Sequence, residues 1–538
     1  MSDASDGVRG RLVDIGGQRY YRIDGLEHME PFLATVVSDS NLWLFISSNG
    51  PLTAGRVDAD RAFLPYETDD RLHRAVGVTG PVSLLTRGTG PGRERWQPFG
   101  RRLDPGCTRA IEKHEVGTAL TLEETNHRWG LRFRQTWEPS RDFGWIRTVQ
   151  LEDLTGEGVE VELVDGLLDI MPPGIGAATE RRASNLADAY KRSETGPWGT
   201  AAIFTLESGI TDRAEPSEAL AATLVWSAGL DGAEVHLDER VLEAAWDGGS
   251  RVPVDLLTGR RGSYLLRGTV TVPAGESVDW VIAADGGLGH AAVHDRLAAV
   301  ADPSVRGHLA ADIVRGRDRL AGLLAAADGV QHTADEVADV HHLSNVLFNS
   351  MRGGILTDGY DLEIKDLIAF LRIRNRRVHE AHHNLLAALG PTAPLATVRA
   401  VAEETGDADL IRLVLEYLPL SFSRRHGDPS RPWNRFSIRI IASDGSDVRY
   451  HEGNWRDIFQ NWEAMLRSYP RFLSNVVATF VNASTVDGYN PYRITRDGID
   501  WEVPDPDDPW SNIGYWGDCR RHPQVAALGT PSFTHLSS

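Results

Sequence analysis

The chain has very little cysteine and no long apolar run. Cys107 and Cys519 are its only cysteines among 538 residues, so a disulfide framework or a cysteine-ligated zinc cluster cannot form. The first residues hold no apolar signal core, and no run of about 18 apolar residues occurs. We therefore expect a cytoplasmic protein with no membrane partner.

Positive charge is also scarce. Lysine and arginine number 56 against 76 aspartate and glutamate residues, which gives a net charge of −20. Nucleic-acid backbones and anionic membranes repel such a chain, so we expect no nucleic-acid partner. Hydrophobic residues make up 41%, an ordinary globular value. At about 150 residues per domain, the length predicts about three units.

Tryptophan, in contrast, is abundant, with 15 residues, many of them beside Asp, Asn, Arg or Gly. A single tryptophan most often fills a core. A tryptophan beside fixed polar groups also suits a sugar-binding cleft, where its face covers the ring and the polar groups bind hydroxyls. The composition leaves both interpretations open.

Residues 1–289 carry the pattern of antiparallel strands. Apolar residues alternate with polar ones over 129–137 and again over 159–163, which is typical of half-buried strands. Turn residues such as Gly16–Gly17 and Asn49–Gly50 separate these runs. Because no repeat of fixed period occurs, we expect a β-sandwich domain over 1–289 rather than a propeller.

The pattern becomes helical after residue 289. Residues 290–333 are rich in alanine, leucine, arginine and aspartate, which predicts a helical linker. Beyond 334, apolar residues recur every three or four positions, first over 337–351. We expect further helices at 361–389, 395–417 and 455–481.

The last residues, 519–538, differ from everything before them. They contain no aspartate or glutamate and show neither helical nor strand periodicity, whereas the segment just before them is acidic and aromatic. We interpret 519–538 as an aberrant tail of the kind that a changed reading frame would produce.

The densest polar and aromatic cluster lies at 451–463. Its apolar spacing predicts a helix that packs on a core. Arg456 and Gln460 would lie one turn apart near the helix start, with Trp455 and Asp457 beside them. An aspartate in a first turn is either a cap and dipole partner or, together with Arg456, a group that binds sugar hydroxyls.

Two further clusters combine turns with aromatic rings. Residues 487–502 hold Asp–Gly and Asn–Pro turns together with Tyr489 and Trp501, large rings that are costly to expose without a purpose. Residues 505–510 hold a close acidic group that includes Asp508, either an exposed turn, a general acid or a cation site. The candidate substrate-binding residues are therefore Trp455, Arg456, Asp457, Gln460, Tyr489, Trp501 and Asp508.

Other catalytic patterns are weak or missing. His379, His382 and His383 lie on one predicted helix, and histidines four residues apart can hold zinc. We expect no glutamate to complete a metalloprotease pattern in this stretch, and therefore expect the histidines to be solvated or hydrogen-bonded, with no metal site. No P-loop, dinucleotide-binding glycine pattern or Gly-x-Ser-x-Gly elbow occurs, so we expect no nucleotide, no cofactor and no serine hydrolase.

The order of parts and two motifs resemble glycoside hydrolase family 94, the cellobiose and chitobiose phosphorylases. The family's Gly-Phe-Arg-Asp-x-x-Gln-Asp segment is similar to residues 454–461, and its Asp-Asp-Pro-x-Trp segment is similar to residues 507–510. The resemblance implies a multidomain α and β fold with an N-terminal antiparallel β-sandwich, a helical linker and an (α/α)6 barrel. At about 12–15 residues per helix plus long loops, 334–518 holds roughly half of the helices that such a barrel needs, which predicts an incomplete barrel.

The resemblance also implies a reaction, the phosphorolysis of β-linked glucosides in a disaccharide or oligosaccharide, with inorganic phosphate as co-substrate. Arg456 and Asp457 would hold the sugar that is cleaved. The family's general acid lies in a Trp-Asn-Asp segment that this chain does not contain, and general acid catalysis is worth ~10²–10⁴-fold in rate. Asp457 is then the remaining candidate for the acid.

Two alternatives stay open. One is a glycoside hydrolase on the same scaffold, with two carboxylates and a water molecule. The other is a non-catalytic carbohydrate-binding remnant. Members of the resembling family are often dimers, which makes a homodimer the oligomeric state to expect.

Overall fold

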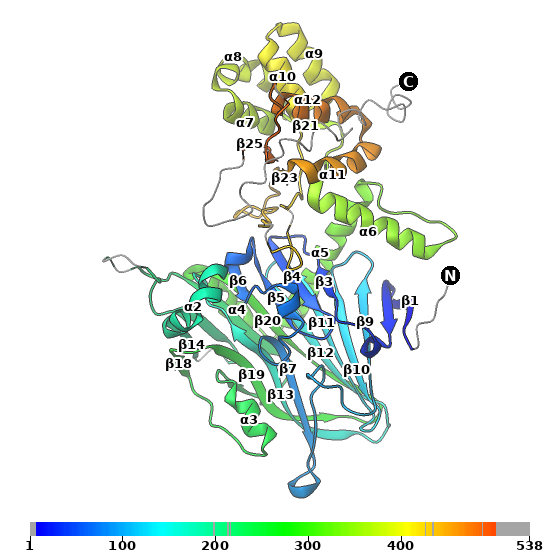
Figure 1. Ribbon diagram of the computed structural model, residues 1–538, viewed down its shortest axis with the longest axis vertical. Coiled ribbons are helices and arrows are strands. Elements are labelled where there is room, and N and C mark those ends of the chain that lie inside the picture. The colour runs from blue at the N-terminus through cyan, green and yellow to red at the C-terminus, as the bar shows by residue number, and fades with distance from the viewer. Residues whose placement is uncertain are drawn as a thin grey trace. The chain divides into compact units, whose positions relative to one another are not determined.

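The chain forms a strand-rich part first and a helical part second. The computed structural model describes residues 7–196, 199–211, 215, 217–425, 427–432, 435–486 and 488–501. Contacts divide the chain into two compact units, 1–320 with 427–435, and 321–426 with 436–538. The sequence of elements confirms the expected mixture of an N-terminal antiparallel β part followed by helices (Figure 1). The finer boundaries at 289, 333 and 518 stay predictions, and 519–538 lie outside the described residues.

An antiparallel sheet of eleven strands dominates the first unit. The predicted alternation is confirmed in β11, where every second side chain from Leu131 to Trp137 is buried. The predicted Gly16–Gly17 turn joins the first two strands, and both glycines have positive φ. In spatial order the strands are β1 (Arg9–Ile15), β2 (Gln18–Asp24), β9 (Cys107–His114), β10 (Leu120–Asn126), β11 (Leu131–Ser140), β12 (Gly144–Asp153), β20 (Ser277–Gly289), β16 (Ala221–Ala228), β15 (Ala202–Leu206), β14 (Lys191–Thr195) and β18 (Leu256–Thr258).

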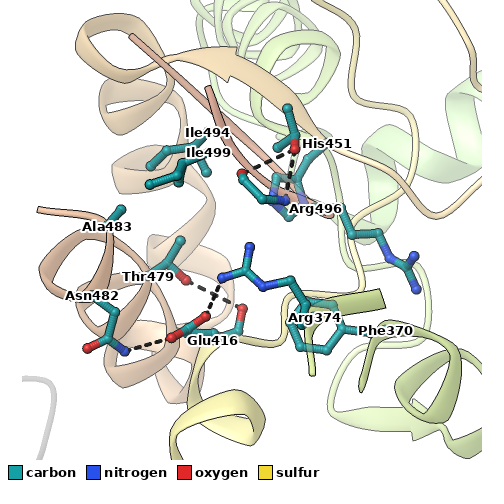
Figure 2. Close-up of a pocket in the computed structure, with 12 residues that line it drawn as sticks. Phe370, Arg374, Glu416, His451, Thr479, Asn482, Ala483, Ile494, Arg496 and Ile499 are labelled. Atoms are coloured by element: carbon teal, nitrogen blue, oxygen red, sulfur yellow. Dashed lines mark hydrogen bonds and ion pairs between the residues drawn. The ribbon is translucent and has the colours of Figure 1, made fainter. Parts of the chain in front are cut away.

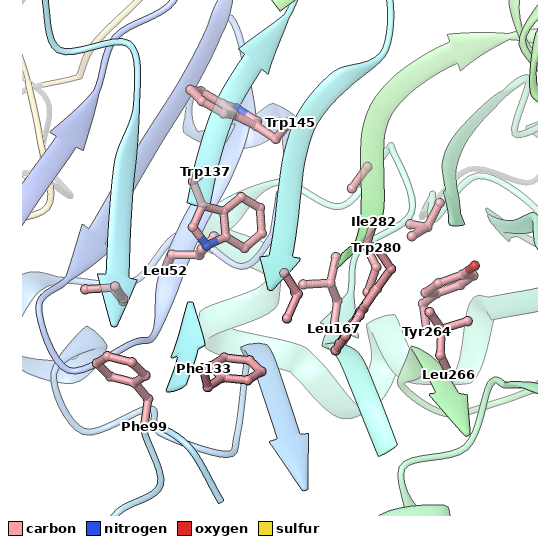
Figure 3. Close-up of a cluster of buried hydrophobic side chains, with 14 of the residues drawn as sticks. Leu52, Phe99, Phe133, Trp137, Trp145, Leu167, Tyr264, Leu266, Trp280 and Ile282 are labelled. Atoms are coloured by element: carbon pink, nitrogen blue, oxygen red, sulfur yellow. The ribbon is translucent and has the colours of Figure 1, made fainter. Parts of the chain in front are cut away.

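Two smaller sheets share one apolar core with the large sheet. The core cluster takes buried side chains from strands of all three sheets, among them Leu52, Trp137, Leu167 and Trp280 (Figure 3). This arrangement gives the first unit the layered packing of a β-sandwich. The smaller sheets are β17 (Glu234–His236), β19 (Gly262–Val272), β13 (Val159–Ile170), β7 (Gly80–Arg87) and β8 (Glu94–Trp96), and β3 (Leu33–Val36), β4 (Leu42–Ser47), β5 (Leu52–Arg56) and β6 (Ala62–Leu64).

A charged pair crosses this core. Arg147 of β12 and Asp165 of β13 lie 2.9 Å apart, and neither side chain is exposed. Ser83 donates a hydrogen bond to Asp165 at 2.6 Å, and Trp280 Nε1 donates another at 2.7 Å. Because every oxygen of the carboxylate has a donor, the charge is compensated inside the core.

The first unit also contains helices that the strand interpretation of 1–289 did not predict. The longest, α2 (Ala177–Tyr190), is interrupted at Ala183, whose φ of −148° is not helical. Alanine, arginine and leucine in this segment favour a helix, but no apolar period marks it within the β region. Within 1–289 the helices are α1 (Asp69–Leu72), α2 and α3 (Arg240–Trp246). α4 (His290–Val300) and most of α5 (Val305–Ala326) also belong to this unit and lie in 290–333, where helices were predicted.

The second unit is built on seven helices within its described residues. The helix predicted at 337–351 is confirmed. The three longer predicted helices are each broken in two: at Asn375, at Gly406 in a left-handed conformation, and at Tyr469–Pro470. Proline cannot continue a helix, and Gly406 provides the positive φ of a helix end. The helices are α6 (Glu336–Gly353), α7 (Ile364–Arg374), α8 (Arg376–Ala387), α9 (Leu395–Thr405), α10 (Ala408–Glu416), α11 (Trp455–Ser468) and α12 (Leu473–Ala483).

Short strands complete the second unit. β23 (Glu452–Asn454), β24 (Arg493–Thr495) and β25 (Gly498–Asp500) form a three-stranded sheet, and β21 (Asp361–Glu363) pairs with β22 (Thr392–Pro394). One apolar cluster joins the helices from α7 to α12 and includes Trp455, Trp462 and Phe480. An (α/α)6 barrel stays a prediction.

The tryptophans mostly fill cores. Nine of the eleven that fall in the described ranges are at most 5% exposed, and only Trp246 and Trp501 are largely exposed. The abundance of tryptophan therefore reflects packing more than a sugar-binding surface. Among the described helices, none is long and apolar enough to cross a membrane.

Candidate functional site

The start of α11 presents the polar cluster that the sequence singled out. β23 leads directly into this helix, and a Cβ on Gly453 would lie 2.7 Å from Ile458, so the turn between strand and helix needs a glycine. The backbone N–H of Trp455 donates to the carbonyl of Tyr492 at 2.9 Å, which occupies one of the free donors of the first turn. The loop before β24 therefore lies against the start of α11.

Trp455 belongs to the core rather than to the surface. Its side chain is 5% exposed and meets the ring of Phe480 edge to face, with centroids 4.8 Å apart. A ring held in this way does not present a face to a sugar. Its proposed contact with substrate stays a prediction that the packing does not favour.

Three predicted residues share the accessible start of the helix. Arg456 and Gln460 are exposed and lie one turn apart, and Asp457 is half-buried in the first turn. Asn454 Nδ2 donates to the Asp457 carboxylate at 3.5 Å. Asn454 itself is only 7% exposed, and its Oδ1 has no hydrogen-bond partner within the described residues. A buried acceptor without a donor is costly, and it marks a place where a ligand hydroxyl would be favourable.

The other predicted residues lie on separate segments. Tyr489 is 39% exposed in the loop between α12 and β24, and Trp501 is 45% exposed just after β25. No hydrogen bond joins either side chain to Asp457 in the part of the chain that the structure describes. Asp508 lies outside the described residues.

A pocket of about 270 Å³ lies between α6 and α11. Asn461 Nδ2 donates to Asn349 Oδ1 at 2.9 Å across this interface, and Trp462 Nε1 donates to the carbonyl of Gly353 at 2.9 Å. Carboxamides, hydroxyls and one guanidinium line the pocket beside apolar side chains, a mixture that suits a polyhydroxylated ligand. The lining includes His342, Asn345, Asn349, Ser350, Asn461, Met465, Arg467 and Ser468.

This pocket continues the face of α11 that carries Asp457. Asn461 lies one turn after Asp457, and Ala464 and Ser468 follow at spacings of three and four. Residues at these spacings lie above one another on a helix. At about 1.5 Å of rise per residue, Asp457 stands roughly 6 Å along the helix from the nearest pocket residue, Asn461. The sequence analysis did not single out Asn461 as a ligand, although it follows Gln460 in the same motif.

A second, smaller cavity of about 60 Å³ lies beside the three-stranded sheet (Figure 2). In it Arg374 donates to Glu416 at 2.6 Å, and Asn482 donates to the same carboxylate at 2.9 Å. Arg496 donates to Asp366 at 2.7 Å. These bonds tie α7 to α10, α10 to α12, and α7 to the turn that follows β24. The volume holds a few water molecules and is well below the range of about 300–1,000 Å³ that is usual for ligand pockets.

His451 lies at the back of this cavity. It is 3% exposed, meets Trp462 edge to face, and its Nδ1 has no hydrogen-bond partner among the described residues. Burial, with the charges of Arg496 and Arg374, lowers the pKa of His451 to about 3. The imidazole is therefore neutral near pH 7. No spacing along the chain predicts this cavity, because its lining comes from five separate elements.

The three histidines of α8 are held in different ways. Nε2 of His382 lies 3.0 Å from Asp407, whose pKa is lowered by this contact and by Arg377. His379 and His383 stack with ring centroids 5.2 Å apart. The expectation that no glutamate completes a metalloprotease pattern here is wrong, because Glu380 follows His379 and gives the His-Glu-x-x-His spacing of zinc proteases. No group of three metal-ligating side chains occurs within the described residues.

The chain enters and leaves the segment of helices α7 to α10 at two neighbouring residues. The backbones of Ile355 and Ser421 exchange two hydrogen bonds, at 2.9 and 3.0 Å, in an isolated β-bridge. The two ends of the segment between them are thus held together. α6, which precedes the segment, and α11, which follows it, pack against each other.

Residues 357–419 match a family model described as "Glycoside hydrolase family 149 insertion domain 1". The match lies inside the segment that the bridge closes. It supports a glycoside-hydrolase-like chain, and the resemblance to family 94 in particular stays a prediction.

Solved structures resemble the chain only loosely. A bacterial glucoamylase complexed with acarbose is 10% identical, covers 76% of this chain and has a TM-score of 0.34. A putative aldose 1-epimerase from Escherichia coli K12 is 10% identical over 48% of this chain, with a TM-score of 0.26. The chain spans 60% of the length of the glucoamylase. No curated protein matches the chain.

Proposed function

We propose that this chain is a carbohydrate-active protein of the glycoside phosphorylase or hydrolase type, and that the start of α11 binds the sugar. The observation that carries the proposal is the pairing of a half-buried carboxylate with an unsatisfied acceptor. Asp457 and the buried Oδ1 of Asn454 lie at the same accessible helix start. Both accept hydrogen bonds, and sugar hydroxyls donate them.

Arg456 and Gln460 complete the set of polar groups. Their exposed side chains lie one turn apart, so both can reach a ligand that lies along the helix. Guanidinium and carboxamide groups donate to the ring and hydroxyl oxygens that Asp457 cannot serve, because a carboxylate only accepts. Bonds to charged groups contribute more than neutral ones, so Arg456 and Asp457 would carry most of the affinity.

The pocket between α6 and α11 would take the next part of the substrate. It lies on the same helix face, its volume is about 270 Å³, and its lining alternates carboxamides with Met465 and Val346. A disaccharide or oligosaccharide that starts at Asp457 would therefore run along α11 towards Asn461.

The chemistry that we propose is phosphorolysis with inversion. Phosphate attacks the anomeric carbon from one face, the glycosidic bond breaks, and a carboxylic acid gives a proton to the leaving oxygen. The product is a sugar 1-phosphate. Asp457 is the candidate for the acid among the residues that α11 presents. The matched family model belongs to a glycoside hydrolase family, and in a hydrolase water would replace phosphate.

The test compares products with and without phosphate. The purified chain is incubated with β-linked disaccharides and with cello- and laminari-oligosaccharides, and the mixture is assayed for sugar 1-phosphate and for free sugar. Sugar 1-phosphate only with phosphate supports phosphorolysis, and free sugar in both mixtures supports hydrolysis. Binding measured by calorimetry without either product supports the binding remnant.

Site variants test the location. Asp457→Asn should weaken oligosaccharide binding about 10- to 100-fold, since a bond to a charged group contributes about 1.5–3 kcal/mol. Glu404→Gln removes an exposed carboxylate from α9, which contributes no residue to the pocket lining, and should leave the affinity unchanged. Equal affinity of the Asp457→Asn chain and the original would place the sugar elsewhere.

A further inference from the structure

A cavity in the first unit concentrates positive charge on a strongly acidic protein. It has a volume of about 230 Å³ and lies where β17, α3, β18 and the segment before β18 meet. Its charged lining consists of Arg240, Arg251, Arg260 and one carboxylate, Asp238. The net charge of the whole chain is −20. With three guanidiniums and one carboxylate, the lining of this cavity is instead positively charged.

The single carboxylate compensates only part of this charge. Arg240 Nε donates to both oxygens of Asp238, at 2.9 and 2.8 Å. Arg251 lies 3.6 Å from the same carboxylate, beyond hydrogen-bond distance. Arg260 has no hydrogen-bond or ion-pair partner among the residues that the structure describes. Two guanidiniums therefore keep donors to offer a ligand.

A buried imidazole lines the same cavity. His236 is 2% exposed, and its Nε2 makes no hydrogen bond with any described residue. Glu234 Oε2 lies 3.5 Å from this nitrogen as a long ion pair, and the Glu234 side chain is 60% exposed. Burial lowers the pKa of His236, against the charge of Glu234, which raises it. A buried imidazole nitrogen with only this long contact is a second sign that the cavity takes a polar ligand.

We propose that this cavity binds a tetrahedral oxyanion, a phosphate group that is either free or esterified to a sugar. Guanidinium forks match the oxygens of such a group, and two of them with spare donors can hold it from two sides. His236 Nε2 would supply a further bond from the floor. The site lies in the first unit and shares no residue with the site at α11. Its test therefore does not depend on the proposed function.

The test is a calorimetric titration of the full chain with inorganic phosphate, at constant ionic strength with sodium chloride as the balancing salt. The Arg251→Ala/Arg260→Ala variant should bind phosphate at least about tenfold more weakly, because it loses two charge-assisted contacts. Arg9→Ala/Arg11→Ala is the matched control: it also removes two guanidiniums, from β1 at the opposite edge of the large sheet from β18, and should bind as the original chain does. Asp457→Asn should also keep this binding, which separates the site from any phosphate used at α11.

A second measurement keeps the proposal open to refutation if the double variant is unstable. The ring signals of His236 should shift in NMR spectra as phosphate is added and should stay unmoved with chloride. Glucose 6-phosphate that binds more tightly than phosphate identifies the ester as the ligand, and equal affinity identifies the free anion. Equal binding by the double variant, or a chloride titration that gives the same signal, would show an adventitious ion only and overturn the proposal.

Discussion

Arg147 and Asp165 pair at 2.9 Å across the core of the first unit, with no exposure of either side chain. We expect Arg147→Met to lower the free energy of unfolding by about 3–5 kcal/mol, because it leaves the Asp165 carboxylate buried without its counter-charge. Urea denaturation followed by tryptophan fluorescence measures the loss.

The control removes both charges. Arg147→Met/Asp165→Leu should recover part of the stability that the single variant loses, since no charge then stays buried. If the double variant is no more stable than Arg147→Met alone, the pair does not act through its charge.

The neutral His451 predicts a pH dependence. Its pKa is about 3 in the folded chain, against about 6.5 in an unfolded one. Between these values the unfolded state binds the proton and the folded state does not, so stability falls as the pH falls below about 6.5, by about 1.4 kcal/mol per pH unit. The charges of Arg374 and Arg496 face the ring and oppose its protonation.

Denaturation of the original chain and of His451→Phe between pH 7 and pH 4 isolates this contribution. The unfolding free energy of the variant should depend less steeply on pH, by the contribution of one proton. The buried His114, whose pKa is lowered to about 4, titrates in both chains and so does not contribute to the difference. Identical slopes, or an NMR titration of His451 with a midpoint near 6, would contradict the assignment.

Trp455 and Arg456 should separate stability from binding. Trp455→Ala removes a ring that is 5% exposed and packed on Phe480, and should cost about 3–5 kcal/mol of unfolding free energy. Arg456→Ala changes an exposed side chain, and should cost less than about 0.5 kcal/mol while it weakens sugar binding. Calorimetry and denaturation of both variants measure the two effects. A stable Trp455→Ala chain with weak sugar binding would show that the indole faces the substrate.

Gly353 fixes how closely α6 and α11 approach. A Cβ at this position would lie 2.9 Å from the Cβ of Asn461, so Gly353→Ala should destabilise the second unit by about 1–3 kcal/mol and distort the pocket between the helices. Gly322 in α5 has no atom within 4 Å of such a Cβ. Gly322→Ala should stabilise its helix by about 0.5–1 kcal/mol. Thermal unfolding of both variants checks the opposite signs.

Periodicity predicted those elements that bury one face. β11 alternates strictly because one side meets the core, and the apolar stripe of α11 is buried from Ile458 to Leu466. Apolar spacing alone predicted single helices over 395–417 and 455–481. Gly406 and Pro470, which lie inside these two segments, are residues typical of helix ends and mark where each helix breaks. Helix α2 escaped prediction because its mean burial is low and no apolar face marks it.

Only the part of the candidate site that lies on one helix could be predicted from the sequence. Arg456, Asp457 and Gln460 share a face because helical geometry fixes their spacing. Two features of the site depend on which segments meet in space: the unsatisfied Oδ1 of Asn454 and the Asn349–Asn461 hydrogen bond. The spacing of residues along the chain does not predict such contacts. The same reason hid the cavity around His451 and the arginine cavity of the first unit.

The bridge between Ile355 and Ser421 makes the four helices between them a side branch of the fold. The two ends are held at about the spacing of paired strands, ~4.8 Å, which a turn of two to five residues spans in a hairpin. The chain between Ile355 and Ser421 can therefore change in length while its two ends stay in place. Its own variation is limited by its apolar packing on α11 and α12, and by Glu416 and Asp366, which accept hydrogen bonds from Asn482 of α12 and from Arg496 just after β24.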